Sequence, residues 1–265
     1  MMRGRAGGVA ALMLAVALGG CGGDDAPATK AADDTTSTSG GGAAALKAYC
    51  ATIVALETTP EPDIDFDAMS PEQQTEEARK FAGQLVPLVE QARATVPAAI
   101  TADVEVLADS IGMIARTGDF SAFDTPKVEA ASDRAHAYEL GHCGWKKVAV
   151  TAVDYAFQGI SDSLPAGVTS FELANEGREP HEITVLRIND DVQLSAKEIV
   201  ELPGEASGTK VEPVAHDFAD PGGHGAALVD LKPGRYFAAC FVPVDGREGG
   251  SSHASKGMVS AFEVK

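Results

Sequence analysis

The chain has 265 residues, of which 39 are acidic and 21 are basic, so its formal net charge is −18. This length allows one or two domains with sizeable hydrophobic cores. The negative charge repels phosphate backbones and argues against nucleic-acid binding, while it favours a basic protein partner.

Residues 1–20 have the pattern of an export signal peptide. Arg3 and Arg5 precede an apolar stretch over residues 9–18 that is too short to span a membrane permanently. Leu18-Gly19-Gly20-Cys21 then resembles the lipobox of bacterial lipoproteins. The resemblance implies a lipid on Cys21 and a location at the extracytoplasmic face of the cell membrane. A plain secretory signal with a soluble product is the alternative.

Residues 21–44 follow as the lipid anchor and a linker. They consist largely of Gly, Ala, Asp, Thr and Ser, with almost nothing to bury. Such a composition predicts a disordered tether that leaves the folded part free to reorient.

Residues 45–147 predict a helical bundle, because apolar residues recur there at helical spacing. Ser70-Pro71 and Thr125-Pro126 are typical helix starts, with a capping residue followed by proline. Gly118 is a typical helix end. Four amphipathic helices with short links indicate an antiparallel all-α domain.

The cysteines then have separate expected fates. Cys50 and Cys143 lie near the first and last turns of the helical region, where we expect a disulfide. Closing a loop of roughly 90 residues would contribute about 4 kcal/mol. With Cys21 acylated, Cys240 is left over, and a lone exported thiol is prone to oxidation unless something occupies it.

Residues 148–265 predict an all-β Greek-key sandwich, because short alternating strands are separated by turns rich in Gly and Pro. The expected strands include residues 168–174, 182–188, 226–231, 235–241 and 258–264, with one short helix over residues 195–202.

Three segments of this half carry His181, Cys240, and the pair His253 and Met258. Their order resembles that of the cupredoxins, the plastocyanin and azurin family of type 1 copper proteins, over roughly residues 150–265. The resemblance implies that these four side chains bind copper. Two imidazoles and a thiolate, with a weakly bound thioether, suit such a site.

Two features differ from the family pattern. The residue after the first histidine is typically an asparagine that braces the ligand loops, and here it is Glu182. The loop of 12 residues between Cys240 and His253 is also longer than usual. A few extra loop residues cost well under about 1 kcal/mol.

The implied function is single-electron transfer with a redox or metal-transfer protein. A module that sequesters or delivers copper, and a metal-free sandwich for protein interaction, remain as alternatives. An enzyme is not expected. Nitrite reductases and multicopper oxidases place a histidine beside the copper cysteine, whereas Ala239 and Phe241 flank Cys240 here.

Other candidate ligands are weaker. His136 and Glu139 lie one helical turn apart, a spacing that can hold a metal, but such pairs often arise by chance. His216 and His224 are interpreted as solvated loop residues.

Overall fold

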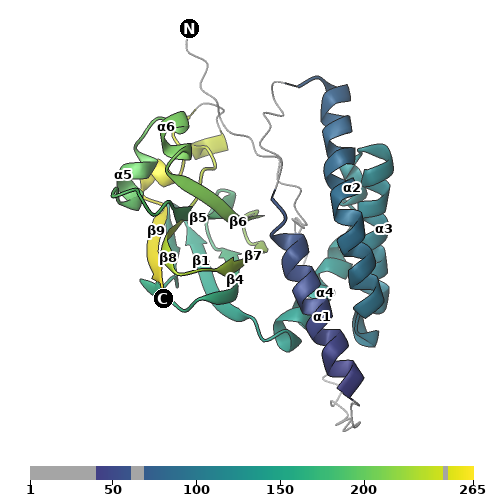
Figure 1. Cartoon of the computed structure of the whole chain (residues 1–265). Helices are drawn as coiled ribbons and strands as arrows, with labels where there is room; N and C mark the ends of the chain where they lie inside the picture. Colours follow the sequence, from purple (N-terminus) through teal and green to yellow (C-terminus); the bar gives the residue numbers. More distant parts are fainter. Residues whose placement is uncertain (1–39, 61–68, 247–249) are drawn as a thin grey trace.

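A computed structural model describes residues 40–60, 69–246 and 250–265 (Figure 1). The predicted signal peptide, Cys21 and most of the linker lie outside the described residues. Within the described part of the chain, no helix combines the length and apolar character needed to cross a membrane.

A helical region comes first. Its four helices are α1 (Gly40–Glu57), α2 (Pro71–Thr95), α3 (Thr101–Thr117) and α4 (Pro126–His142), with short 3-10 turns at Ala98–Ile100 and Phe120–Ala122. Along the described chain α2 packs against both α1 and α3, and α3 packs against α4 (Figure 1).

Local sequence explains where these helices begin and end. Ser70 forms a capping box with Gln73 at the start of α2, and the Thr125 hydroxyl accepts the Val128 N–H at the start of α4. Gly118 ends α3 with a φ of 72°, a left-handed conformation that glycine adopts without a steric penalty.

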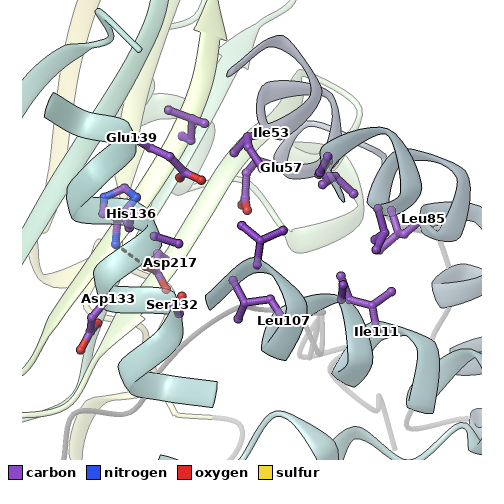
Figure 2. A pocket seen from close by; sticks show the side chains of 18 of the residues that line it. Ile53, Glu57, Leu85, Leu107, Ile111, Ser132, Asp133, His136, Glu139 and Asp217 are labelled. Atoms are coloured by element: carbon purple, nitrogen blue, oxygen red, sulfur yellow. Dashed lines mark hydrogen bonds between the residues drawn. The ribbon is translucent and has the colours of Figure 1, made fainter. Parts of the chain in front are cut away.

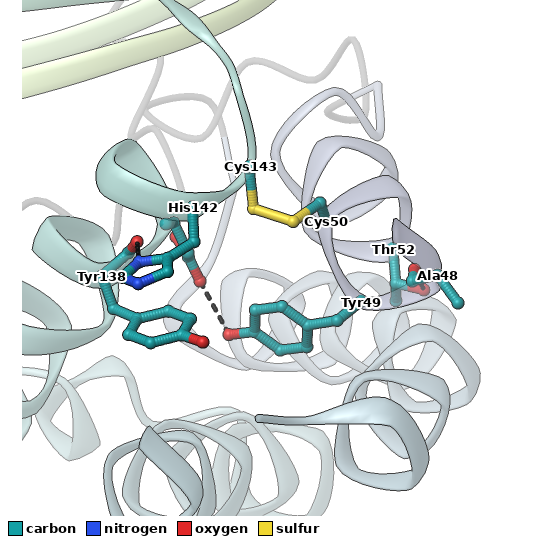
Figure 3. Close-up of a disulfide and its surroundings, with 8 residues drawn as sticks. Ala48, Tyr49, Cys50, Thr52, Tyr138, His142 and Cys143 are labelled. Atoms are coloured by element: carbon teal, nitrogen blue, oxygen red, sulfur yellow. Dashed lines mark hydrogen bonds between the residues drawn. A yellow bond between two sulfur atoms is a disulfide. The ribbon is translucent and has the colours of Figure 1, made fainter. Parts of the chain in front are cut away.

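A disulfide joins the first and last helices. It links Cys50 of α1 to Cys143, the residue that follows α4, and their Cα atoms are 5.6 Å apart (Figure 3). Beside it, the buried Tyr49 donates its hydroxyl proton to Glu139 Oε1 at 2.7 Å. The two ends of the helical region are therefore held by a covalent bond and a buried polar contact.

The strands of the C-terminal half form two sheets. Within the described residues they are β1 (Lys146–Val153), β2 (Ala156–Gln158), β3 (Ser163–Leu164), β4 (Gly167–Asn175), β5 (His181–Ile188), β6 (Val211–Ala219), β7 (His224–Leu231), β8 (Gly234–Ala239) and β9 (Val259–Val264). One sheet has the order β2-β1-β4-β7 and the other β3-β9-β8-β5-β6. Side chains from both sheets share one apolar core, which makes this half a β-sandwich.

Two elements differ from the sequence-based expectation. Strand β6 was not expected, because Pro213 and a weak apolar alternation obscure it. It lies at the edge of its sheet, where proline is tolerated, and its register with β5 shifts near Pro213. The short helix expected over residues 195–202 is α5 (Ala196–Val200), and a further helix, α6 (Gly204–Gly208), follows it.

The helices lie along one side of the sandwich, with α1 against β7 (Figure 1). His136 of α4 contacts Glu172 of β4, with 3.3 Å between Nε2 and Oε1. The buried Trp145 occupies the short link between α4 and β1.

Candidate metal centre

Sheet topology brings three of the predicted ligands to one end of the five-stranded sheet. His181 is the first residue of β5, and Cys240 directly follows β8, which runs antiparallel to β5. His253 lies in the loop that leads into β9, the other neighbour of β8. Antiparallel pairing therefore places the start of β5, the end of β8 and the start of β9 side by side.

The donor atoms of these three residues converge at a buried point. His181 Nδ1 lies 3.0 Å from His253 Nδ1, and Cys240 Sγ lies 3.3 Å from His253 Nδ1 and 3.9 Å from His181 Nδ1. All three side chains are fully buried. Among the described residues, His181, Cys240 and His253 are a group of side chains whose donor atoms, all within 4.8 Å of one another, lie close enough to bind one metal ion.

Backbone hydrogen bonds fix the loop that carries Cys240, His253 and Met258. The Cys240 N–H donates to the Met258 carbonyl, and the Met258 N–H donates to the His253 carbonyl. The Cys240 carbonyl accepts the Ala254 N–H at 2.7 Å. Met258 is fully buried and belongs to the same core cluster as Cys240.

Glu182, which follows His181, cross-links the segments that carry the ligands. Its carboxylate accepts the backbone N–H of Phe241 at 2.7 Å, and its own N–H donates to Cys240 Sγ at 3.4 Å. Its other oxygen contacts His216 Nε2 at 3.1 Å. Glu182 therefore joins the start of β5 to the segment that follows β8.

Each imidazole also meets a carboxylate on its outer edge, which the sequence did not indicate. His181 Nε2 lies 3.0 Å from Asp154 Oδ1, and His253 Nε2 lies 3.2 Å from Glu179 Oε2. Tyr155 donates its hydroxyl proton to Glu179 Oε1 at 2.5 Å and packs its ring against His253. Carboxylate–imidazole pairs orient histidine ligands and make their inner nitrogens more basic.

Burial controls the protonation of this cluster. It raises the pKa of the Cys240 thiol to about 12, although the Glu182 N–H opposes the rise. Burial also lowers the pKa of His181, against the opposing effect of Asp154. For Asp154 itself, burial favours the neutral form, but hydrogen bonds from Arg178 and His181 outweigh it and lower the pKa. A neutral His181 and an ionised Asp154 follow near neutral pH.

This donor set fits copper. Two imidazole nitrogens and one thiol sulfur lie around a common point, and the fully buried Met258 belongs to the same core cluster as Cys240. Soft sulfur together with imidazole nitrogen is the combination that trigonal copper sites use. An ion at this point would also take the place of the Cys240 proton, because the thiolate is the form that binds metals.

The weaker candidates lie elsewhere. His216 contacts Glu182 on the sheet, and His224 is exposed on β7. His136 and Glu139 face different partners, Glu172 and Tyr49 respectively. Their one-turn spacing therefore does not assemble a group of metal donors among the described residues.

A cavity of about 270 Å³ lies among helices α1 to α4 and reaches residues of β4, β6 and β7. Figure 2 shows apolar side chains of α2 and α3 on one side of the cavity and polar side chains of α4, together with Asp217 of β6, on the other. Burial and the charge of Asp217 raise the pKa of Glu57 to about 7, and burial and the charge of Glu57 raise that of Glu139 to about 7. The labelled lining residues include Ile53, Glu57, Leu85, Leu107, Ile111, His136, Glu139 and Asp217.

Comparison with known proteins adds a likeness in solved structures. No protein-family model matches the chain, and no curated protein matches it. Auracyanin B is 21% identical with a TM-score of 0.31, and the match covers 45% of this chain and 88% of auracyanin B. Rusticyanin from Thiobacillus ferrooxidans is 16% identical with a TM-score of 0.30, and the match covers 45% of this chain and 78% of rusticyanin. Both neighbours are cupredoxins.

Proposed function

We propose that this protein is a membrane-anchored, extracytoplasmic copper protein that transfers single electrons. The observation that carries the proposal is the convergence of Cys240 Sγ with the Nδ1 atoms of His181 and His253 at one buried point. Cys240 is a buried free thiol that faces two imidazoles, and metal binding is the most direct explanation for this arrangement.

Each residue has a distinct task in this proposal. His181, His253 and Cys240 would bind the ion through two nitrogens and one sulfur, and Met258 would supply a weak fourth ligand. When bound, copper supplies a couple between its monovalent and divalent states. The chain supplies a rigid and dry setting, because backbone hydrogen bonds fix the loop and all four side chains are fully buried. Little rearrangement is then needed when the charge changes.

The location follows from residues outside the described part of the chain. We propose that residues 1–20 are removed, that Cys21 carries the lipid, and that the linker connects it to the helices. The acidic composition supports a basic electron-transfer or metal-transfer partner, since opposite charges accelerate encounter.

The direct test is copper titration of the purified chain, followed by its visible spectrum. We expect one equivalent of copper and an intense thiolate-to-copper absorption band that is lost in Cys240→Ala and His181→Ala. His224→Gln is the matched control, because this histidine is exposed on β7 outside the centre. A spectrum without the band, or a band that survives in Cys240→Ala, excludes this function. Failure to retain any metal favours a metal-free interaction module.

Copper sequestration or delivery is a second candidate, and burial supports it. Neither imidazole has exposed surface, so no ligand edge reaches the surface of the described chain. Such enclosure favours retention of the ion over rapid exchange of electrons. Reduction by a small soluble reductant distinguishes the two functions, because a carrier is reduced rapidly and reversibly while a storage site responds slowly.

A further inference from the structure

Each of the two imidazoles contacts a carboxylate at the nitrogen that points away from the metal centre. His181 and His253 both point Nδ1 inward, and each places Nε2 against a carboxylate, Asp154 or Glu179. An ionised carboxylate only accepts hydrogen bonds, so each Nε2 is the protonated nitrogen. Each Nδ1 is then left with the lone pair that a metal needs.

Both carboxylates are held in place by the chain. Asp154 accepts the backbone N–H groups of Arg178 and Glu179 and the Arg178 side chain. Glu179 is fixed by the Tyr155 hydroxyl at 2.5 Å. Their side chains are 11% and 20% exposed, so solvent screens their charges weakly.

We propose that Asp154 and Glu179 act through His181 and His253 to favour the divalent over the monovalent state of the bound metal, and so set a low reduction potential. This inference rests on the proposed function. The two residues are positioning residues, because they touch the imidazoles and not the ion.

Charge counting gives the direction of the effect. With the Cys240 thiolate and the two carboxylates, a divalent ion leaves one negative charge in the centre and a monovalent ion leaves two. Adding an electron to a poorly hydrated site that is already negative is unfavourable. The Arg178 guanidinium offsets little of this charge, because its side chain is 92% exposed.

Hydrogen bonding acts in the same direction as charge. An imidazole that donates a hydrogen bond to a carboxylate becomes more basic at its other nitrogen, which then binds a metal more strongly. Stronger nitrogen donors stabilise the divalent ion more than the monovalent ion, which prefers soft sulfur. Both effects therefore lower the potential relative to a site whose imidazoles face water.

The test compares Asp154→Asn and Glu179→Gln with the unaltered full chain, loaded with copper alone. Each variant removes one charge and keeps an acceptor oxygen. We expect the affinity for Cu(I) relative to Cu(II) to rise roughly tenfold in each, which is about 59 mV in the reduction potential. Glu176→Gln is the matched control, because Glu176 is an exposed carboxylate in the same loop, and it should change the ratio less than about twofold.

A second measurement needs no variant. In the diamagnetic Cu(I) protein, nitrogen-15 NMR should show both imidazoles protonated at Nε2, with these protons shifted downfield and slow to exchange. Protonation at Nδ1 overturns the proposal, and so does an unchanged affinity ratio in folded Asp154→Asn and Glu179→Gln. If the thiolate band is present while the ratio is unchanged, only this inference fails. Absence of the band in the unaltered chain removes the proposed function and this inference together.

Discussion

Glu182 accepts the backbone N–H of Phe241 at 2.7 Å, although 59 residues separate them in the chain. The contact joins the start of β5 to the segment that follows β8, one residue from a ligand on each side. The Glu182 carboxylate thus braces the two segments that carry His181 and Cys240.

Removal of this brace is expected to loosen the centre. Glu182→Ala should lower the free energy of unfolding by about 1–3 kcal/mol, since it removes the hydrogen bond of the Phe241 N–H to a charged acceptor. Glu182→Gln keeps an acceptor oxygen and should stay within about 1 kcal/mol of the unaltered chain. Urea unfolding of the metal-free protein measures both. Equal losses in the two variants would show that charge, and not the hydrogen bond, matters here.

Gly177 is expected to be intolerant of any side chain. A Cβ at this position would lie 2.5 Å from Asp154 Oδ1 and 2.5 Å from His181 Nε2, so it would separate the carboxylate from the imidazole. Gly177→Ala should cost about 1–3 kcal/mol and broaden or weaken the copper absorption.

Gly83→Ala serves as the control for this substitution, because a Cβ there meets nothing within 4 Å. This exposed position in α2 should gain about 0.5–1 kcal/mol from the alanine. Thermal unfolding and the visible spectrum of both variants provide the measurement. Normal copper absorption in Gly177→Ala would contradict the geometry around His181.

The disulfide is expected to stabilise the helical region without affecting the metal centre. The double variant Cys50→Ser/Cys143→Ser should lose about 4–5 kcal/mol of unfolding free energy, because a loop of 93 residues is no longer closed in the unfolded chain. Its copper spectrum should stay unchanged, since Cys50 lies in α1 and Cys143 directly follows α4, and neither belongs to the ligand loop. Urea unfolding followed by circular dichroism tests the first point, and a spectral change would contradict the second.

Glu139 is expected to make stability depend on pH. Burial, together with the charge of Glu57, raises its pKa to about 7 in the folded protein, although the hydrogen bond from Tyr49 opposes this. A raised pKa means that the folded state binds the proton more tightly. The stabilisation is therefore complete below about pH 4.5 and is lost as the pH rises toward 7.

Glu139→Gln removes this titration and keeps an acceptor for Tyr49. Above pH 7 it should be more stable than the unaltered chain by up to about 3 kcal/mol, and the difference should vanish near pH 4. Unfolding free energies at several pH values measure the effect. Glu76→Gln, on the exposed side of α2, should give a curve parallel to the unaltered protein, and a parallel curve for Glu139→Gln would contradict the assignment.

Sequence by itself determined the features that depend on a few neighbouring residues. Ser70, Thr125 and Gly118 mark helix ends because capping needs only groups within one turn. Alternation and turn residues likewise indicated most strands. These signals are local, so they can be recognised without knowing where the rest of the chain lies. The candidate ligands His181 and Cys240 were suggested instead by a resemblance to the cupredoxins.

Tertiary structure alone decided which distant residues meet. Asp154 and Glu179 lie in loops, where a carboxylate does not by itself predict any function. Only the packing of the two sheets brings them to the imidazoles. Pro213 argued against a strand at β6, because proline lacks the N–H that a central strand needs. It is tolerated because β6 lies at the edge of its sheet, and only the whole sheet shows which strand is at the edge. Contacts across a sandwich depend on long-range register, and no short stretch of sequence specifies that register.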